Sequence, residues 1–439
     1  MIHYFSLGGE YFLYDVESSS LLEIDKIVYD VLSGNNLDQY NEADVEEVNK
    51  ELAELRKQGI IDAPSPDVGA QPKSKEIKAM CMHLSHDCNL RCKYCFAGEG
   101  LYHGERMHMS LEVAKKAIDF LIANSGSRHN LEVDFFGGEP LMNFDVLKQT
   151  VEYGRQQAKL HNKEFKFTTT TNGILLTEEV SKYLNEEMDN VVLSLDGRKQ
   201  INDSQRPTAN GKGSFDLIID KYRFFRSIRG DKSYFIRGTF TSANPDFAKD
   251  VLEMTNLGFD QVSVEPVVLP EDHPLAIKPE QMTEILDNYE QLAVKYVEMR
   301  KKPETWFSFF HFVVELENGP CYKKRLVGCG AGSEYVAVTP DGSIYPCHQF
   351  AGESQYLLGN VFDGKLNEEI RDMYRNSSIF TKPVCQNCWA KYHCSGGCAA
   401  NAIHYNGDIN KPYLEACEMM KKRLECALYV YAKERKTID

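Results

Sequence analysis

Three thiols lie within eight residues of one short segment, where Cys88, Cys92 and Cys95 follow a C-x3-C-x2-C spacing. A cluster of four irons takes one ligand per iron, and cysteine thiolate is the usual ligand. Three thiols on one loop therefore hold three irons and leave the fourth open to bind a substrate. The other interpretations are structural cysteines or a zinc site, but zinc sites usually use four ligands in paired spacings such as C-x2-C.

The same segment resembles the signature loop of the radical S-adenosylmethionine (SAM) enzymes, with Tyr94 as the aromatic residue before the third cysteine. The resemblance implies that the open iron chelates the amino and carboxylate groups of SAM. It also implies that one electron from the cluster cleaves SAM to a 5′-deoxyadenosyl radical, which abstracts hydrogen from substrate. In this interpretation Cys88, Cys92 and Cys95 are the catalytic cluster ligands, and Tyr94 contributes to cofactor binding.

The chain has 439 residues, a net charge of −15 and 13 cysteines. The acidic balance argues against a nucleic-acid enzyme, which normally shows a basic footprint. The first residues lack the charged and apolar regions of a signal peptide, and no apolar run approaches the ~18 residues of a membrane span. We therefore expect a cytoplasmic protein without a membrane partner, whose cysteines are metal ligands rather than disulfides.

Strand and helix patterns alternate from residue 78 to about residue 300, which predicts parallel βαβ units. Six such units suit an α/β fold with a partial (β/α)6 barrel, which the resemblance also implies. Active sites of parallel barrels lie at the C-terminal ends of the strands, and the cysteine segment follows the first strand. The expected strands are Ala79–Ser85, Glu132–Phe136, Lys166–Thr170, Val191–Leu195, Phe235–Thr241 and Gln261–Val264.

Further candidate residues lie in or directly after later strands of the barrel. Gly137, Gly138 and Glu139 follow the second strand and, although ordinary in a turn, match the family motif that hydrogen-bonds the SAM amino group. The resemblance assigns Ser194, at the end of the fourth strand, to SAM binding. Arg237 lies in the fifth strand, where we expect it to be buried and to need an anionic partner. The resemblance gives it the SAM carboxylate, whereas the alternative is a polar pair of Ser194 and Arg237.

The region 301–439 contains a second set of cysteines whose spacing resembles the SPASM domain of radical SAM peptide maturases. The resemblance implies two auxiliary four-iron clusters, which makes three [4Fe–4S] clusters in the chain. The interleaved division of ligands comes from the resemblance, since spacing alone does not favour it. It gives Cys329, Cys347 and Cys398 to the first auxiliary cluster, and Cys385, Cys388, Cys394 and Cys417 to the second.

Cys321 lies eight positions before Cys329 and leaves two alternatives open. It is the fourth ligand of the first auxiliary cluster, or that cluster has an open iron. An open iron would bind a substrate cysteine thiolate directly.

Residues 1–62 form a small unit ahead of a linker at 63–77 that contains several prolines. Two β-rich runs around Gly8-Gly9 predict a hairpin, and helical patterns cover 20–32 and 44–58, followed by a short strand at Ile60-Ile61. This order resembles a winged-helix domain that binds the leader of a precursor peptide, often as an added strand. An accessory subdomain that only caps the barrel is the alternative, but the downstream motifs favour peptide recognition.

The whole chain resembles the maturases of SCIFF peptides (six cysteines in forty-five residues). The resemblance implies a thioether between a cysteine sulfur and a threonine α-carbon, as in sactipeptides, formed in a ribosomally made cysteine-rich precursor. A reductant such as flavodoxin or ferredoxin would supply electrons. An anaerobic sulfatase maturase, which makes formylglycine, is the alternative, and it does not require a leader-binding domain. A non-enzymatic electron carrier is disfavoured by the open three-cysteine loop.

Overall fold

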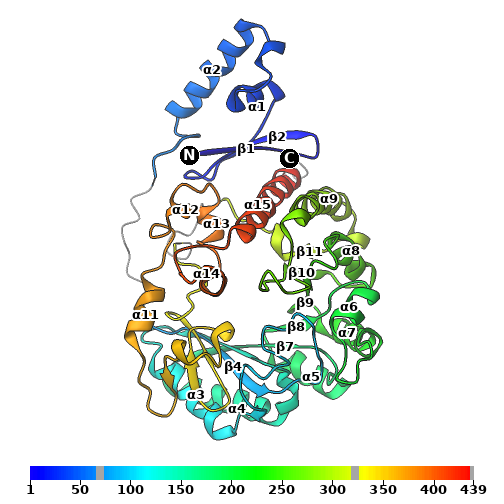
Figure 1. Ribbon diagram of the computed structural model, residues 1–439, viewed down its shortest axis with the longest axis vertical. Coiled ribbons are helices and arrows are strands. Elements are labelled where there is room, and N and C mark those ends of the chain that lie inside the picture. Colours follow the sequence, from blue (N-terminus) through cyan, green and yellow to red (C-terminus); the bar gives the residue numbers. More distant parts are fainter. Residues whose placement is uncertain (66–73, 318–325, 436–439) are drawn as a thin grey trace.

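The strands of the central region form one large curved sheet (Figure 1). The computed structural model describes residues 1–65, 74–317 and 326–435. The sheet does not close on itself, so the expected α/β fold with a partial barrel is confirmed. Its central strands run parallel: β4 (Ala79–His86), β6 (Asn130–Gly137), β7 (Glu164–Thr171), β8 (Asn190–Ser194), β9 (Ser233–Phe240) and β10 (Gln261–Pro266). The short β5 (Met107–His108) pairs antiparallel with β4.

The connecting helices lie along the outer side of the curved sheet (Figure 1). Side-chain caps start two of them, since Ser110 accepts a hydrogen bond from Val113 N at 3.2 Å and Thr177 accepts one from Val180 N at 3.2 Å. The short α6 after β8 was not expected from the sequence. The helices are α3 (Leu111–Ala123), α4 (Phe144–His161), α5 (Glu178–Glu187), α6 (Lys199–Gln205), α7 (Phe215–Arg229), α8 (Ala248–Asn256) and α9 (Met282–Arg300).

Side chains alternate between the two faces of the sheet, as the period of a strand requires. Phe135 of β6 and Phe167 of β7 are fully buried in the apolar core, and their rings stack with centroids 5.7 Å apart. The intervening residues on the other face include Asp134 and Thr168, which are paired in register. The helices pack on the apolar face of the sheet, so the polar inner face is available to form a binding site.

Two strands from the C-terminal part extend this sheet beyond the six expected strands. β12 (Tyr335–Val338) runs parallel to β4, and β11 (Ser308–Phe309) runs parallel to β10. The strand–helix repeats were expected to end at about residue 300, but strands after that position also belong to the central sheet. Antiparallel strands β13 (Ser343–Tyr345) and β14 (Gly359–Asn360) follow β12. Such short strands carry too few residues for a periodic pattern to show.

The C-terminal part is otherwise made of short helices and one long helix. These are α11 (Glu368–Arg375), α12 (Pro383–Gln386), α13 (Lys391–Cys394), α14 (Ala399–Asn406) and α15 (Leu414–Arg435). Figure 1 shows α15 running toward the N-terminal strands, beside α9, with which it packs. No described helix combines the length and the hydropathy of a segment that crosses a membrane.

The N-terminal unit is a three-stranded antiparallel sheet, in the order β1 (Ile2–Leu7), β2 (Glu10–Asp15), β3 (Leu21–Ile24), with helices α1 (Lys26–Ser33) and α2 (Glu42–Lys57). The expected hairpin and second helix are present. The helix expected from residue 20 was wrong at its start, because Leu21–Ile24 pair with β2 instead. The strand expected at Ile60-Ile61 is absent, since this stretch is a bend whose Ile61 is buried against Leu52.

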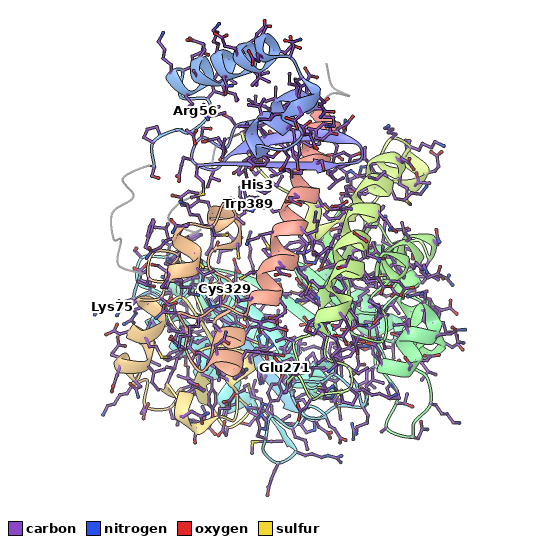
Figure 2. All side chains as sticks on the ribbon, turned by 45° about the horizontal axis from the view of Figure 1, so that its top comes forward. His3, Arg56, Lys75, Glu271, Cys329 and Trp389 are labelled. Carbon is purple, nitrogen blue, oxygen red and sulfur yellow. The ribbon has the colours of Figure 1, made fainter. Side chains whose placement is uncertain are left out.

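The N-terminal sheet packs on the C-terminal part through a dense set of contacts. The rings of His3 and Trp389 stack with centroids 3.7 Å apart, and the two labels lie together in Figure 2. His3 also contacts Glu425 of α15 at 2.9 Å. A nearly buried ion pair joins Lys391 to Glu17 at 3.0 Å. The N-terminal unit is thus fixed beside the segment that carries several of the C-terminal cysteines.

Phe12 gives a test of this junction. It is fully buried between Phe5 and Tyr429, with ring centroids 5.2 and 5.9 Å away. Phe12→Ala is expected to destabilise the protein by about 4 kcal/mol, because a large aromatic contact is replaced by a cavity. Thermal unfolding measures the loss, and hydrogen exchange should rise in β1 and α15. Leu160→Ala is the control, since Leu160 is 75% exposed; equal effects of both changes would contradict the assignment.

Candidate active site

The loop of Cys88, Cys92 and Cys95 follows β4 directly, at the edge where the parallel strands end. Its backbone is hydrogen-bonded to the C-terminal end of α6 and to the segment that follows it. Arg91 N donates to Pro207 O at 2.8 Å, and Lys93 N donates to Gln205 O at 2.9 Å. These bonds give the loop a fixed path, so the three thiols do not depend on a mobile turn for their positions.

Gly137 and Gly138 bring the end of β6 against the start of the cysteine loop. Gly138 N donates to Ser85 O at 2.8 Å, and Glu139 N donates to Asp87 O at 2.9 Å. A Cβ at position 138 would lie 2.2 Å from Asp87 O, and one at 137 would lie 2.3 Å from Ser85 O. Gly137 also has a positive φ of 120°. Only glycine fits at these two positions without moving backbone.

Glu139 is completely buried, and its carboxylate accepts three hydrogen bonds. The donors are Leu141 N at 3.1 Å, the Thr171 hydroxyl at 2.7 Å and Asn172 N at 2.8 Å. Burial raises the pKa of Glu139 to about 7, although these hydrogen bonds oppose the rise. The side chain therefore ties the end of β6 to the end of β7. Its role toward the SAM amino group stays a prediction.

Asn172 connects β7 to the cysteine loop. Its Nδ2 donates to Asn89 Oδ1 at 2.8 Å and lies 3.5 Å from Cys88 Sγ. Asn172 lies two residues after the expected third strand, Lys166–Thr170, and no local pattern indicates that it touches a thiol. Amide donors near a cluster sulfur are one of the features that set its reduction potential.

Tyr94 belongs to a buried polar cluster with Asp196 and Arg206. Its hydroxyl donates to Asp196 at 2.8 Å and accepts from Arg206 at 2.7 Å. Asp196 also accepts from Thr239 N at 3.0 Å. The Arg206 charge opposes the rise that burial causes in the pKa of Cys92, so this guanidinium favours the thiolate. No local pattern indicates this link, because Asp196 and Arg206 lie more than 100 positions after Tyr94 in the chain.

Ser194 and Arg237 are register neighbours on β8 and β9. In the described chain no side-chain hydrogen bond joins them, and Ser194 O accepts one from the Tyr222 hydroxyl at 3.0 Å. The expectation that Arg237 is buried was wrong: its side chain is exposed on the inner face of the sheet. It still lowers the pKa of Asp134, which burial raises to about 7. The assignment of Ser194 and Arg237 to SAM stays a prediction.

The C-terminal thiols fall into two groups in space. Burial raises the pKa of Cys347, and the thiols of Cys398 and Cys329 lie close enough to raise it further. Burial likewise raises the pKa of Cys417 to about 12, with further contributions from the other three thiols of its group, Cys394, Cys385 and Cys388. The resemblance implies the same division, and the role of these thiols as cluster ligands stays a prediction. Cys321 lies outside the described residues.

Backbone donors point at several of these thiols. Cys398 is the N-cap residue of α14, and the N–H groups of Ala400 and Asn401 lower its pKa against the effect of burial. A helix N-terminus of this kind stabilises a thiolate. Gly397 and Gly396 do the same for Cys394. The cysteines are therefore held in settings suited to anionic ligands.

The donor set of the barrel loop fits an iron–sulfur cluster. All twelve cysteines of the described residues are free thiols. In that part of the chain, no group of three or more His, Cys, Asp or Glu side chains is arranged to hold a single metal ion. Burial raises the pKa of Cys88 to about 12 and of Cys92 to about 11, and the neighbouring loop thiols add to both rises. Cluster binding must therefore release their protons.

The barrel loop and the C-terminal thiols meet through aromatic residues. Phe96, directly after Cys95, lies 5.5 Å from the ring of His348, which follows Cys347. Phe136 lies 5.2 Å from the same ring. No local pattern indicates this meeting, because His348 lies more than 200 residues further along the chain than Phe96 and Phe136.

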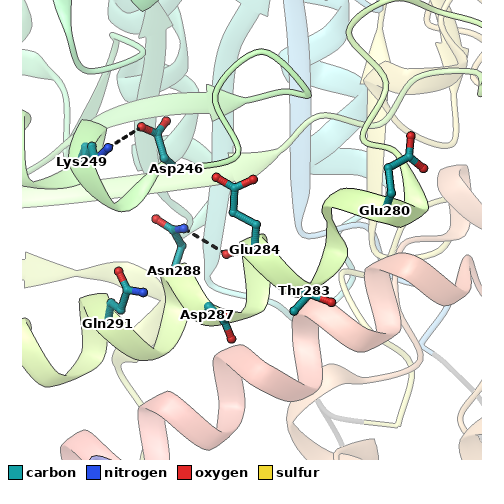
Figure 3. A pocket seen from close by; sticks show the side chains of 8 residues that line it. All are labelled: Asp246, Lys249, Glu280, Thr283, Glu284, Asp287, Asn288 and Gln291. Atoms are coloured by element: carbon teal, nitrogen blue, oxygen red, sulfur yellow. Dashed lines mark hydrogen bonds and ion pairs between the residues drawn. The ribbon is translucent and has the colours of Figure 1, made fainter.

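A surface pocket of about 530 Å³ lies away from these thiols, between α8 and α9. Figure 3 shows the acidic side chains of Asp246, Glu280, Glu284 and Asp287 around it. Asp246 is paired with Lys249 at 3.1 Å, as the dashed line marks. None of the candidate residues lines this pocket, so it is not the site.

Comparison with known proteins agrees with these two sets of thiols. A family model described as the Radical SAM superfamily matches residues 82–241. A second, described as the SPASM iron–sulfur cluster-binding domain, matches residues 329–389. The first model contains the three-cysteine loop and every barrel residue proposed for SAM.

Two similar proteins differ in how much of this chain they cover. A cysteine-type anaerobic sulfatase-maturating enzyme of Clostridium novyi is 25% identical over 74% of this chain and 89% of its own length. A radical SAM cyclopropyl synthase, TigE, of Paramaledivibacter caminithermalis is 24% identical over 91% of this chain and 89% of its own length.

Two solved structures share the fold. The enzyme anSMEcpe with bound AdoMet superposes with a TM-score of 0.67 and 20% identity, over 82% of this chain and 96% of its own. SuiB of Streptococcus suis, bound to its precursor peptide SuiA, gives a TM-score of 0.55 and 17% identity, over 94% of this chain and 97% of its own.

Gly138 provides a test of the site. Gly138→Ala is expected to abolish most iron binding at the barrel loop, because the new Cβ would overlap Asp87 O and displace the loop. The readouts are iron content and SAM cleavage. They are measured in a protein whose seven SPASM cysteines are replaced by alanine, so that bound iron reports on the barrel loop alone. Gly104→Ala is the matched control from the same loop, since its Cβ would meet Leu101 O at 3.6 Å, an ordinary contact. A normal iron content in Gly138→Ala would refute the close approach.

Asp134 gives a pH-dependent test. Because burial raises its pKa to about 7, folded protein keeps a proton that the unfolded chain, with a pKa of 3.8, releases. The free energy of unfolding should therefore fall between about pH 4 and pH 7 in the wild type relative to Asp134→Asn. Denaturant titrations across this range measure the difference. Glu132→Gln, at an exposed position of the same strand, is the control and should follow the wild type.

Proposed function

We propose that this chain, an enzyme of the radical SAM superfamily with a SPASM domain, forms a thioether in a ribosomally made cysteine-rich precursor peptide. The bond would join a cysteine sulfur to the α-carbon of a threonine. A family model match establishes the enzyme class, whereas the peptide substrate and the bond are our proposal. Flavodoxin or ferredoxin is the proposed electron donor.

The N-terminal unit is the observation that carries the proposal. The matches to TigE and SuiB cover 91% and 94% of this chain. The part that each match leaves out is shorter than the N-terminal unit (residues 1–62), so each match includes at least part of that unit. SuiB is described with a precursor peptide bound, and TigE is a cyclopropyl synthase. The sulfatase-maturating enzyme covers only 74%. Likeness that reaches into the N-terminal unit is therefore found with SuiB, which is described with a bound precursor peptide, and this supports a peptide-binding role for the unit.

The N-terminal sheet offers an edge for a leader peptide. β3 pairs with β2 on one side, and among the described strands none pairs with its other side. Beside it, Val28 and Leu32 of α1 are only half-buried, as is Leu22 of β3. An added strand would satisfy the open backbone groups of β3, and its apolar side chains would cover these residues. The precursor leader is the proposed occupant.

The proposed reaction removes two hydrogens from the peptide as sulfur bonds to carbon. The threonine α-hydrogen leaves as an atom, and the thiol hydrogen leaves as a proton while one electron is withdrawn. Bound cofactors would supply a carbon radical to take the hydrogen atom and an iron–sulfur acceptor to take the electron. Cys88, Cys92 and Cys95 would hold the barrel cluster, and the seven SPASM cysteines would hold the auxiliary clusters.

The chain's own residues keep this site ordered and set its charge. Asn172 donates near Cys88 Sγ, and Arg206 favours the thiolate of Cys92. The glycines at the end of β6 allow the loop to lie against the strand ends. SAM would bind between this loop and the inner sheet face that carries Ser194 and Arg237.

Anaerobic sulfatase maturation is the second candidate. It is favoured by the cysteine-type anaerobic sulfatase-maturating relative of Clostridium novyi, which is 25% identical to this chain. In that case the same radical would act on a cysteine or serine side chain and yield formylglycine. The N-terminal unit would then only cap the barrel.

Mass spectrometry of the anaerobic reaction distinguishes the two candidates. The purified enzyme, SAM and dithionite are incubated with a cysteine-rich precursor that carries its leader. Thioether formation is expected to lower the peptide mass by two hydrogens and to make one cysteine resistant to alkylation. A precursor without the leader should react far more slowly. Aldehyde formation on a sulfatase peptide, with the precursor unchanged, would reverse the ranking.

A barrel variant is the matched control for this assay. Cys88→Ala removes one proposed ligand of the catalytic cluster and is expected to abolish both 5′-deoxyadenosine release and the mass change. Cys81→Ala is the comparison, because Cys81 is buried and belongs to neither thiol group. It should retain both activities, and equal loss in the two variants would contradict the assignment.

A further inference from the structure

Lys382 is a buried lysine three residues before Cys385. It is 4% exposed, and its Nζ donates to Gly396 O at 2.7 Å. In the part of the chain that the structure describes, no carboxylate lies within 4.0 Å of this ammonium group. Its charge is thus enclosed with a single backbone acceptor.

The thiols around Lys382 come from both C-terminal groups. Burial lowers the pKa of Lys382, and the thiols of Cys385, Cys394, Cys398 and Cys417 oppose that change. Cys398 belongs to one group, and the other three belong to the second. A small pocket is lined by Lys382 together with Cys329 of the first group. Lys382 therefore lies between the two sets of proposed ligands.

The turn between Cys394 and Cys398 places the lysine there. Ser395, Gly396 and Gly397 all have positive φ, of 60°, 86° and 75°. A Cβ on Gly396 would lie 3.4 Å from both the Cδ and the Nζ of Lys382. The lysine side chain thus lies across the short link that joins the two thiol groups in the sequence.

A cation in this position needs a nearby negative charge, because an isolated buried charge is costly. Lys391 shows the usual solution nearby, since Glu17 neutralises it at 3.0 Å. No such carboxylate serves Lys382 among the described residues, and cysteine thiols are the groups that surround it. Thiolate ligands and the clusters they hold are anionic, so they would balance its charge.

We propose that Lys382 is the counter-charge shared by the two SPASM clusters and that it raises their reduction potentials. One-electron reduction adds one negative charge to a cluster, and a buried cation beside it favours the reduced form. This makes the clusters better acceptors of the electron that thioether formation releases. The inference rests on the proposed function only in that the SPASM thiols hold clusters.

Redox titration of two variants tests the proposal. The protein carries Cys88→Ala, Cys92→Ala and Cys95→Ala, so only SPASM clusters give a signal. Lys382→Met removes the charge at similar length, and Lys382→Arg keeps it. Titration with dithionite, followed by electron paramagnetic resonance, is expected to show lower potentials in Lys382→Met and nearly unchanged ones in Lys382→Arg. Unchanged potentials in Lys382→Met, with full iron content, would overturn the proposal.

A double variant that leaves the net charge unchanged is the control for non-specific structural effects of substitution near the clusters. Lys391→Met with Glu17→Gln removes a buried ion pair of zero net charge beside the same cysteines, so the potentials should stay near those of the parent protein. A shift as large as that of Lys382→Met would contradict the assignment to charge. Because substrate is absent from the titration, its result does not depend on which bond the enzyme makes.

Two further measurements distinguish an effect of the Lys382 charge from an effect of its packing. They are the iron content of the variants and the thermal stability of the metal-free protein. Loss of iron in Lys382→Met but not in Lys382→Arg supports the charge role, whereas loss in both variants overturns it. In the metal-free protein, thermal unfolding of Lys382→Met should occur at the same or a higher temperature than in the parent. A clear decrease would show that the hydrogen bond to Gly396 is the main role of the lysine and would overturn the proposal.

Discussion

The contact between the end of β6 and the start of the cysteine loop is the constraint on which the site depends. Gly138 and Glu139 donate backbone hydrogen bonds to Ser85 and Asp87, and a Cβ at position 138 has no room. The buried Glu139 carboxylate then continues the connection to Thr171 and Asn172 at the end of β7. Three consecutive strand ends are thereby held as one rigid rim around the thiols.

Charge is arranged differently at the barrel and in the SPASM region. At the barrel, Arg206 lies in a cluster with Tyr94 and Asp196, so its cation is shared between a carboxylate and the neighbouring thiol of Cys92. In the SPASM region, helix and turn N–H groups point at Cys398 and Cys394. Lys382 adds a full positive charge between the two thiol groups. Both arrangements favour thiolates in sites where burial alone would oppose them.

The N-terminal unit and the SPASM region share one interface. His3 stacks on Trp389, directly after Cys388, and Lys391 pairs with Glu17 across the same junction. A peptide added at β3 would therefore lie on the sheet whose opposite edge strand, β1, contacts the segment that carries the second thiol group. This arrangement is consistent with the proposed roles of the three parts: peptide recognition by the N-terminal unit, electron transfer by the SPASM region and radical chemistry in the barrel.

Local patterns predicted much of the fold. Six parallel strands and most of their helices appeared where the alternating patterns indicated, because each is long enough to show its period. The patterns failed at short elements such as β11 and β12, and at Leu21–Ile24, where pairing with β2 prevails over a helical spacing. Arg237 was expected to be buried, but its side chain points to the open inner face of the sheet.

The sequence by itself determined the thiol motifs and the strand ends that carry them, because ligand spacing and strand period are local properties of the chain. Only the tertiary structure grouped the C-terminal thiols, joined Tyr94 to Asp196 and Arg206, and enclosed Lys382 among cysteines from both groups. Those relations join residues that are far apart in the chain. They arise from packing and burial, which no local spacing encodes.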